Sequence, residues 1–134
     1  MRRLLTIGTF DIPHMGHASF LRKCEQYADE IIVGVNTDKF VEQYRGVPPV
    51  FPFSERRDIL TELGYRVEAN YDAGRKLITR VLPDVLAIGS DWARKDYYAQ
   101  IDVDQDFMDA YDITMVYIPY TPGISSTELK RRLA

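Results

Sequence analysis

The first part of the chain constrains the fold more than any other stretch. Residues 4–7 are mostly apolar and predict a strand that ends at Gly8, and a tight crossing over 9–13 leads to a helix beginning near Met15 or Gly16. A glycine lets the backbone approach a ligand closely, and the first N–H groups of a helix have no partner within the helix. The stretch therefore predicts a phosphate-binding turn.

Both histidines of the chain lie in this turn. His14 and His17 flank the expected phosphate on one side of the first helical turn, where each can donate an N–H to a phosphate oxygen. Gly16 keeps a side chain away from the ligand. A His-x-x-His pair could also be half of a zinc site, but the chain has no third histidine and one cysteine, Cys24. Only carboxylates could complete such a ligand set, so we expect no protein-bound metal.

Motifs spread along the chain resemble one enzyme family. Gly-Thr-Phe-Asp at 8–11 followed by His-Met-Gly-His at 14–17 is similar to the GTFD…HxGH signature of the nucleotidyltransferases, most closely of their cytidylyltransferase branch. Arg56, the Gly-Ser-Asp-Trp of 89–92 and the Gly-Ile-Ser-Ser-Thr of 123–127 fit the same family in the same order. The last stretch resembles the family's second signature, ISSTxxxxR. Within the branch, the length and motif order most resemble the glycerol-3-phosphate enzymes.

The resemblance implies transfer of a cytidylyl group from CTP to a small phosphorylated alcohol, with glycerol 3-phosphate as the first choice. An acceptor phosphate attacks the α-phosphorus in line, pyrophosphate leaves, and Mg²⁺ is bound to the nucleotide. The catalytic pair is His14 and His17. The implied nucleotide contacts are Thr9, Phe10, His14, His17, Gly89, Asp91, Trp92, Tyr120, Thr121, Ile124, Ser125, Ser126 and Thr127. The implied acceptor contacts are Asp11, Arg45, Arg56 and Arg75.

Two positions depart from the glycerol-phosphate enzymes. Those enzymes have Arg-Tyr-Val-Asp-Glu where this chain has Gly-Tyr-Arg-Val-Glu at 64–68, so either Arg66 acts from a shifted register or the acceptor differs. They also place an arginine on the triphosphate where this chain has Tyr120, and Lys130 or Arg131 could compensate.

Two other functions stay open. Adenylyltransferases that act on sugar or pantetheine phosphates share these signatures, and Arg45-Gly46 followed by prolines is similar to a heptose-phosphate adenylyltransferase loop. The chain could also bind a nucleotide without turnover, since it lacks the arginines expected near Gly64 and Tyr120.

Alternating strands and helices predict an α/β fold. A strand, helix and strand within some 35 residues imply a right-handed βαβ unit. We predict a Rossmann-like three-layer sandwich with a five-stranded parallel sheet, formed by one domain over 1–134, with the N-termini of the first and last helices meeting at the carboxyl edge of the sheet. The predicted strands are 4–8, 30–36, 65–69, 83–89 and 113–118; the predicted helices are 16–28, 38–43, 54–63, 73–81 and 125–133.

Two segments do not fit this alternation. Residues 44–53 carry three prolines and predict an irregular connection, either a mobile active-site loop or a rigid crossover. Residues 93–110 are rich in charged and aromatic residues, and we expect a solvated segment with a helix near its end. The irregular spacing of their acids indicates an exposed acidic face rather than a metal site.

Composition narrows the partners and the compartment. The net charge is −3, and the basic residues are dispersed except at 130–132, which argues against a nucleic-acid surface. One cysteine excludes an intrachain disulfide and fits a reducing compartment. The apolar stretch near the N-terminus is too short for a signal peptide or a membrane span. We therefore expect a cytoplasmic enzyme that acts on CTP and a small phosphorylated acceptor as a homodimer, without nucleic acid or membrane.

Overall fold

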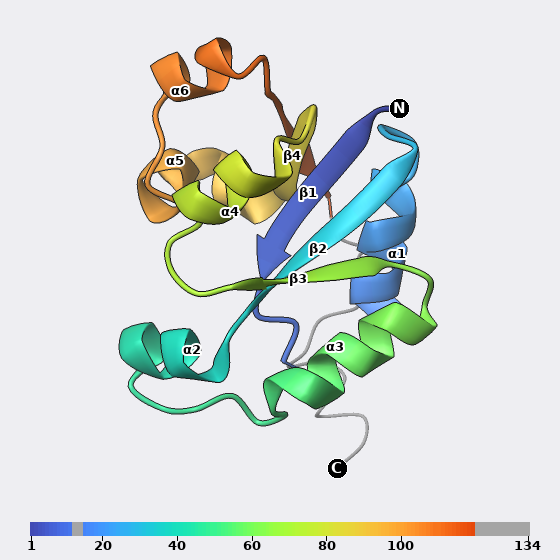
Figure 1. Cartoon of the computed structure of the whole chain (residues 1–134), viewed down its shortest axis with the longest axis vertical. Coiled ribbons are helices and arrows are strands. Elements are labelled where there is room, and N and C mark those ends of the chain that lie inside the picture. The colour runs from blue at the N-terminus through green and yellow to red at the C-terminus, as the bar shows by residue number, and fades with distance from the viewer. Residues whose placement is uncertain (12–14, 120–134) are drawn as a thin grey trace.

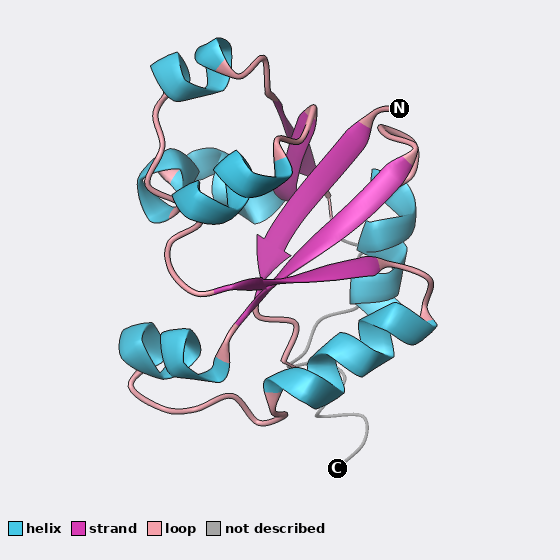
Figure 2. Ribbon diagram, viewed as in Figure 1, coloured by secondary structure: helices cyan, strands magenta, loops and turns pink. Residues whose placement is uncertain are grey.

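The structure is a computed structural model that describes residues 1–11 and 15–119. Within this part of the chain, strands alternate with helices (Figure 1, Figure 2). The strands are β1 (Arg3–Gly8), β2 (Glu30–Asn36), β3 (Arg66–Asn70), β4 (Val85–Gly89) and β5 (Thr114–Ile118). The α-helices are α1 (Met15–Cys24), α2 (Asp38–Arg45), α3 (Phe53–Glu62), α4 (Arg75–Val81), α5 (Tyr97–Gln100) and α6 (Gln105–Ala110), and η1 (Ser90–Arg94) is a 3₁₀ turn. None of these helices is long and apolar enough to cross a membrane.

All five strands form one parallel sheet in the order β3-β2-β1-β4-β5. Leu5 of β1 lies opposite Ile32 of β2 on one side and Leu86 of β4 on the other. The connections run outward from β1 to β3 and then cross to β4, so the order of the strands reverses between β1 and β4. The predicted α/β class with a five-stranded parallel sheet is confirmed.

Successive side chains along each strand pack on opposite faces of the sheet, as strand geometry requires. Leu4 and Val33 belong to a core covered by α1 and α3, whereas their neighbours Leu5 and Ile32 belong to a second core covered by α4, α5 and α6. Figure 1 shows these two sets of helices on opposite sides of the sheet. Burial on both faces explains why the strands are runs of apolar residues.

Helix α2 begins where the sequence predicts, and α3 does not. The hydroxyl of Thr37 accepts from the Phe40 N–H at 3.3 Å and caps α2. We predicted Ser54 as the cap of α3, but this helix begins at Phe53 after Pro52 and has no cap from its own N-cap side chain. The Asp38 carboxylate accepts from the Phe53 N–H at 2.9 Å instead. A side chain from α2 therefore caps the start of α3, where a serine next to the helix usually does so.

The expected helix near the end of 93–110 is present as α6, but the prediction that the segment is solvated is wrong. Side chains from 97–113 close the second core, including Tyr97, Met108 and Ile113. Two exposed acids in this segment are helix caps: Asp96 accepts from Ala99 N–H at 3.1 Å, and Asp104 accepts from Phe107 N–H at 2.8 Å. The helices are too short for the apolar spacing of an amphipathic helix to be recognised in the sequence.

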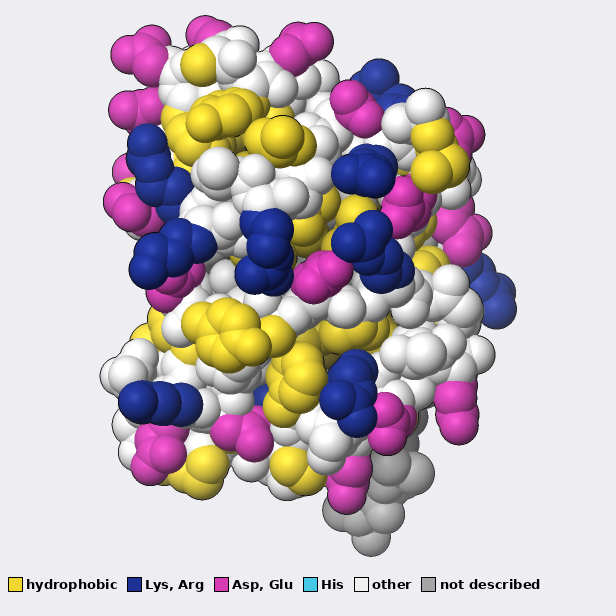
Figure 3. All heavy atoms as spheres, in the orientation of Figure 1, with side chains coloured by type: hydrophobic (Ala, Val, Ile, Leu, Met, Phe, Trp, Pro, Cys, Tyr) yellow, Lys and Arg dark blue, Asp and Glu magenta, His cyan; other side chains and the backbone are white. Residues whose placement is uncertain are grey.

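The edge strand β3 carries charge rather than apolar surface. The Arg66 guanidinium lies 3.0 Å from the Glu30 carboxylate and 2.9 Å from that of Glu68, and Arg80 lies 3.5 Å from Glu68. Figure 3 shows basic and acidic side chains interspersed over this face. Charged side chains on an exposed edge strand oppose pairing with another strand.

Replacing Ile113 by Ala tests the packing of 97–113. Ile113 is 7% exposed, and deleting a buried isoleucine side chain costs about 2–5 kcal/mol of unfolding free energy. The matched control is Ile59→Ala, because Ile59 is 38% exposed and its loss should cost roughly 1 kcal/mol or less. Urea denaturation measures both variants, and equal losses would contradict the described packing.

Candidate active site

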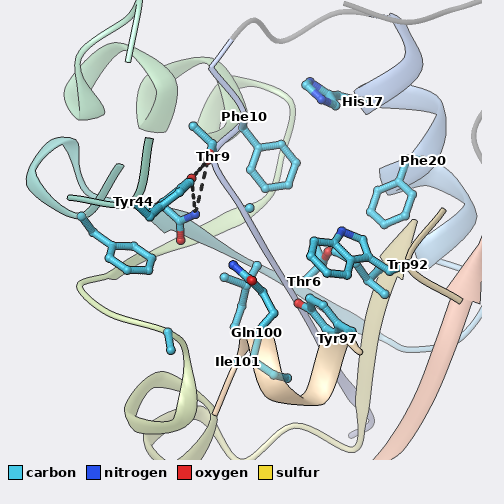
Figure 4. Close-up of a pocket in the computed structure, with 16 residues that line it drawn as sticks. Thr6, Thr9, Phe10, His17, Phe20, Tyr44, Trp92, Tyr97, Gln100 and Ile101 are labelled. Carbon is cyan, nitrogen blue, oxygen red and sulfur yellow. Dashed lines mark hydrogen bonds between the residues drawn. The ribbon is translucent and has the colours of Figure 1, made fainter. Parts of the chain in front are cut away.

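A pocket of about 270 Å³ opens at the carboxyl edge of the sheet, beside the crossover between β1 and β4 (Figure 4). Open α/β sheets bind ligands at this place because adjacent loops diverge there. The pocket is lined by Thr6, Ile7, Gly8, Thr9, Phe10, His17, Phe20, Asn36, Phe40, Tyr44, Ala73, Ile88, Trp92, Tyr97, Gln100 and Ile101. Among these described residues, none is Lys, Arg, Asp or Glu.

The turn after β1 brings the Phe10 ring against His17. Phe10 has φ 52°, a conformation that is costly for an aromatic residue. A Cβ on Gly8 would lie 2.9 Å from Cε2 of Phe10, so a larger residue at this position would displace the ring. The Phe10 and His17 rings meet edge to face with centroids 5.3 Å apart. The strained turn therefore helps to fix the imidazole at the pocket (Figure 4).

Three polar side chains meet at another part of the pocket wall. The hydroxyls of Thr9 and Tyr44 are 2.6 Å apart, and Asn36 Nδ2 donates to both, at 3.3 and 3.4 Å. Thr6 also lines the pocket, and its buried hydroxyl has no hydrogen-bond partner within the described part of the chain. The wall thus offers neutral hydrogen-bonding groups to a ligand.

Trp92 forms an aromatic wall with Tyr97. Their ring centroids are 5.3 Å apart, and Lys95 Nζ lies 5.2 Å from the Trp92 centroid. This side of the pocket can pack against a flat or apolar group. Of the neighbouring residues that we predicted as nucleotide contacts, Gly89 is buried at the end of β4 and Asp91 is exposed, and neither lines the pocket.

Comparison with known proteins identifies the family. The family model described as "Cytidylyltransferase-like" matches residues 5–132. The chain belongs to the cytidylyltransferase-like family. The glycerol-3-phosphate cytidylyltransferase of Bacillus subtilis (strain 168) is 30% identical over 138 residues, which cover 100% of this chain and 98% of that protein. The predicted family is therefore confirmed.

Other relatives share the domain within a different context. The bifunctional protein HldE of Vibrio vulnificus (strain YJ016) is 39% identical over 97 residues, which cover 69% of this chain but only 20% of that protein. This chain thus spans a small part of the length of the HldE relatives. The lipopolysaccharide core biosynthesis protein of Thermoplasma volcanium GSS1 has a similar structure, with a TM-score of 0.68, 26% identity, and coverage of 90% of this chain and 97% of that one.

Arg56, which we predicted as an acceptor contact, is buried among protein acceptors in this cytidylyltransferase-like domain. Its side chain is 0% exposed. Its guanidinium donates to the carbonyl oxygens of Phe51, Thr9 and Asn36 at 2.9, 2.8 and 2.7 Å, and to the Asp38 carboxylate at 2.6 Å. The side chain is therefore a buried tie between the ends of β1 and β2, helix α2 and the loop before α3.

Asp11 and Arg45 hold the connection over 46–52. The Asp11 carboxylate accepts from the N–H groups of Val50 and Phe51 at 2.8 and 2.9 Å, and the Arg45 guanidinium lies 3.6 Å from it. Both residues were predicted to bind the acceptor, but neither lines the described pocket. These contacts favour the rigid crossover over the mobile loop.

The contacts of Arg75 and the position of Arg66 indicate structural roles as well. Arg75, which we predicted as an acceptor contact, donates to the Asp102 carbonyl at 3.1 Å and lies 4.7 Å from the Phe107 ring centroid. It therefore links α4 to α6, and it does not line the described pocket. Arg66 begins β3, at the end of the strand opposite the pocket, which removes the shifted-register explanation for its position.

Several predicted site residues lie outside the described residues and stay predictions: His14, Tyr120, Thr121, Ile124, Ser125, Ser126 and Thr127. Conversely, we did not predict a site role for Asn36, Tyr44, Tyr97 and Gln100, which line the pocket. Asn36 ends a predicted strand and could have been found from that placement. Tyr97 and Gln100 fell in the segment that we expected to be solvated.

The single cysteine has no role at this site. Cys24 is buried at the end of α1, and burial, with a smaller contribution from the charge of Glu25, raises the pKa of its thiol to about 12. Within the described residues, no three His, Cys, Asp or Glu side chains are grouped as metal ligands. A thiolate nucleophile at neutral pH is therefore excluded for this residue.

Replacing Arg56 by Lys tests its role as a tie. Lysine cannot reach several carbonyl oxygens at once, and unpaired buried acceptors cost about 1–3 kcal/mol each. We expect a loss of at least about 2 kcal/mol of unfolding free energy by urea denaturation. The control is Arg57→Lys, since the Arg57 side chain is 48% exposed. Equal stability of both variants would show that the buried guanidinium contributes nothing.

Thiol labelling tests the burial of Cys24. Its raised pKa leaves almost no thiolate at pH 8 in the folded chain, so iodoacetamide should react at least about 100-fold more slowly than with urea-unfolded protein. Mass spectrometry follows the modification, and rapid labelling of the native chain would contradict the described environment.

Proposed function

We propose that the protein transfers a cytidylyl group from CTP to a small phosphorylated alcohol, glycerol 3-phosphate foremost, and forms a CDP-alcohol and pyrophosphate. The observation that carries the proposal is that the signature turn, with Thr9, Phe10 and His17, meets the Trp92 loop at one pocket at the switch point of the sheet. The end-to-end similarity to a glycerol-3-phosphate cytidylyltransferase supports the choice of nucleotide and acceptor.

The reaction needs positioned donors more than a protein nucleophile. A phosphate oxygen of the acceptor forms a bond to the α-phosphorus of CTP, the bond to the β-phosphate oxygen breaks, and pyrophosphate leaves with the electron pair. Charge grows on the oxygens around the α-phosphorus, and an imidazole N–H of His17 stabilises it. His14, and the hydroxyls of 125–127 for the β and γ phosphates, complete this set in the proposal. Mg²⁺ would be coordinated by the phosphate oxygens of CTP and would screen their charge, because no carboxylate lines the described pocket.

A second candidate uses ATP and a sugar phosphate. It is favoured by the similarity of 39% over 97 residues to an HldE protein and by Arg45-Gly46 before the prolines. Pyrophosphate release from CTP and from ATP, measured with glycerol 3-phosphate and with heptose 1-phosphate, separates the two. The main proposal expects turnover with CTP and glycerol 3-phosphate, and turnover only with ATP and the sugar phosphate would replace it. Binding of CTP without product from either acceptor would indicate a module without catalysis.

The proposal extends to assembly and compartment. We expect a homodimer in the cytoplasm, which sedimentation equilibrium and fractionation of the source cells can test.

Replacing His17 by Ala should lower kcat strongly without unfolding the chain. Loss of one oriented donor to a developing charge costs about 10²- to 10³-fold in kcat. The control is Arg22→Ala, an exposed change on the same helix, which should keep kcat. Pyrophosphate release and the thermal midpoint are measured for both variants. A folded His17→Ala protein with near-normal kcat would refute the catalytic role.

A further inference from the structure

Two buried amides fix the direction of a hydrogen-bond chain that ends at the pocket. Asn70 is 1% exposed, and its Nδ2 donates to Asn36 Oδ1 at 2.9 Å and to the Asp72 carbonyl at 2.6 Å. The Asp72 carbonyl can only accept, so the opposite orientation of the Asn70 amide would set its oxygen against that carbonyl oxygen. Asn36 Oδ1 must therefore face Asn70, and Asn36 Nδ2 must face Thr9 and Tyr44.

This direction leaves one hydroxyl hydrogen available to a ligand. The hydroxyls of Thr9 and Tyr44 both accept from Asn36, and neither can donate to its amide nitrogen. One of them donates to the other across 2.6 Å. The remaining O–H has no acceptor among these partners, and both side chains line the pocket. The chain Asn70–Asn36–Thr9–Tyr44, here called the amide relay, thus presents a neutral O–H donor.

The Tyr44 end of the relay lies apart from His17 and Trp92, whereas Thr9 is itself a predicted nucleotide contact. Figure 4 shows Thr9 and Tyr44 on one side of the pocket and His17, Phe20 and Trp92 on the other. A nucleotide whose α-phosphate is at His17 leaves the relay side for the acceptor. Either hydroxyl can be the donor of the 2.6 Å pair. With Thr9 as the donor, the O–H that remains belongs to Tyr44, a pocket-lining residue that is 45% exposed.

The chemistry of this wall selects among acceptor alcohols. An alcohol oxygen can accept the O–H of the relay, whereas an ammonium group has no lone pair to accept it. The described lining contains no carboxylate to pair with an ammonium. The Trp92 ring, which could hold a cation, already has Lys95 Nζ 5.2 Å from its centroid. All of these features disfavour a cationic acceptor.

We propose that Tyr44, oriented by the amide relay, is a specificity-determining residue that binds a hydroxyl of an uncharged polyol phosphate and disfavours amino-alcohol phosphates. This inference rests on the proposed function and deepens it. Tyr44 contacts the acceptor, and Asn70 is a positioning residue that acts through Asn36.

Steady-state kinetics with CTP and each of glycerol 3-phosphate, phosphoethanolamine and phosphocholine test the inference. We expect the wild-type chain to prefer glycerol 3-phosphate. Tyr44→Phe removes one neutral hydrogen bond and should raise the KM for glycerol 3-phosphate by about 3- to 10-fold, with the KM for CTP and kcat little changed. The matched control is Tyr71→Phe, since Tyr71 is 69% exposed and does not line the pocket.

A second variant tests the relay behind Tyr44. In Asn70→Asp, the carboxylate cannot donate to Asn36 Oδ1 and can only accept from Asn36 Nδ2, so the Asn36 amide reverses and its oxygen faces Thr9 and Tyr44. The effect of Asn70→Asp on the KM for glycerol 3-phosphate should not add to that of Tyr44→Phe, and circular dichroism checks that the variant folds. An effect that simply adds would overturn the relay.

The outcomes separate this inference from the proposed function. A preference for an amino-alcohol phosphate, or an unchanged KM for glycerol 3-phosphate in Tyr44→Phe, would overturn the role of Tyr44 while leaving cytidylyl transfer intact. Absence of turnover with all three acceptors would overturn both.

Discussion

The site depends on one buried cation, the guanidinium of Arg56. Its donors join the carbonyl oxygens at the ends of β1 and β2 to the Asp38 carboxylate and to the loop before α3. Backbone carbonyls at strand ends have no partner in the sheet, and burying them is favourable only if a donor reaches them. Arg56 supplies that donor, so the Thr9 turn and Asn36 keep a fixed separation at one wall of the pocket.

The parallel sheet was predictable because its strands are buried on both faces. Such strands are runs of apolar residues, which are easily recognised in the sequence. The region over 97–113 was not, because its helices are short and its buried residues are separated by capping acids such as Asp96 and Asp104. Tertiary packing determines the structure of such a segment, and the local sequence pattern does not reveal that packing.

The same contrast applies to the candidate site. Thr9, His17 and Trp92 were identified from motifs and share a pocket. The arginines were harder to assign, because a guanidinium suits a phosphate and a set of backbone carbonyls equally well. The burial of Arg56 and the contacts that Arg56 and Arg75 make within the protein indicate structural roles. Neither burial nor contacts can be read from a sequence.

A crystal structure with an unreactive CTP analogue would locate the nucleotide in the pocket. We expect the triphosphate at the carboxyl edge between β1 and β4, with an α-phosphate oxygen in hydrogen-bond distance of the His17 imidazole and the acceptor side of the pocket beside Tyr44 left open. A nucleotide bound at another surface, or one whose phosphates lie away from His17, would contradict this expectation.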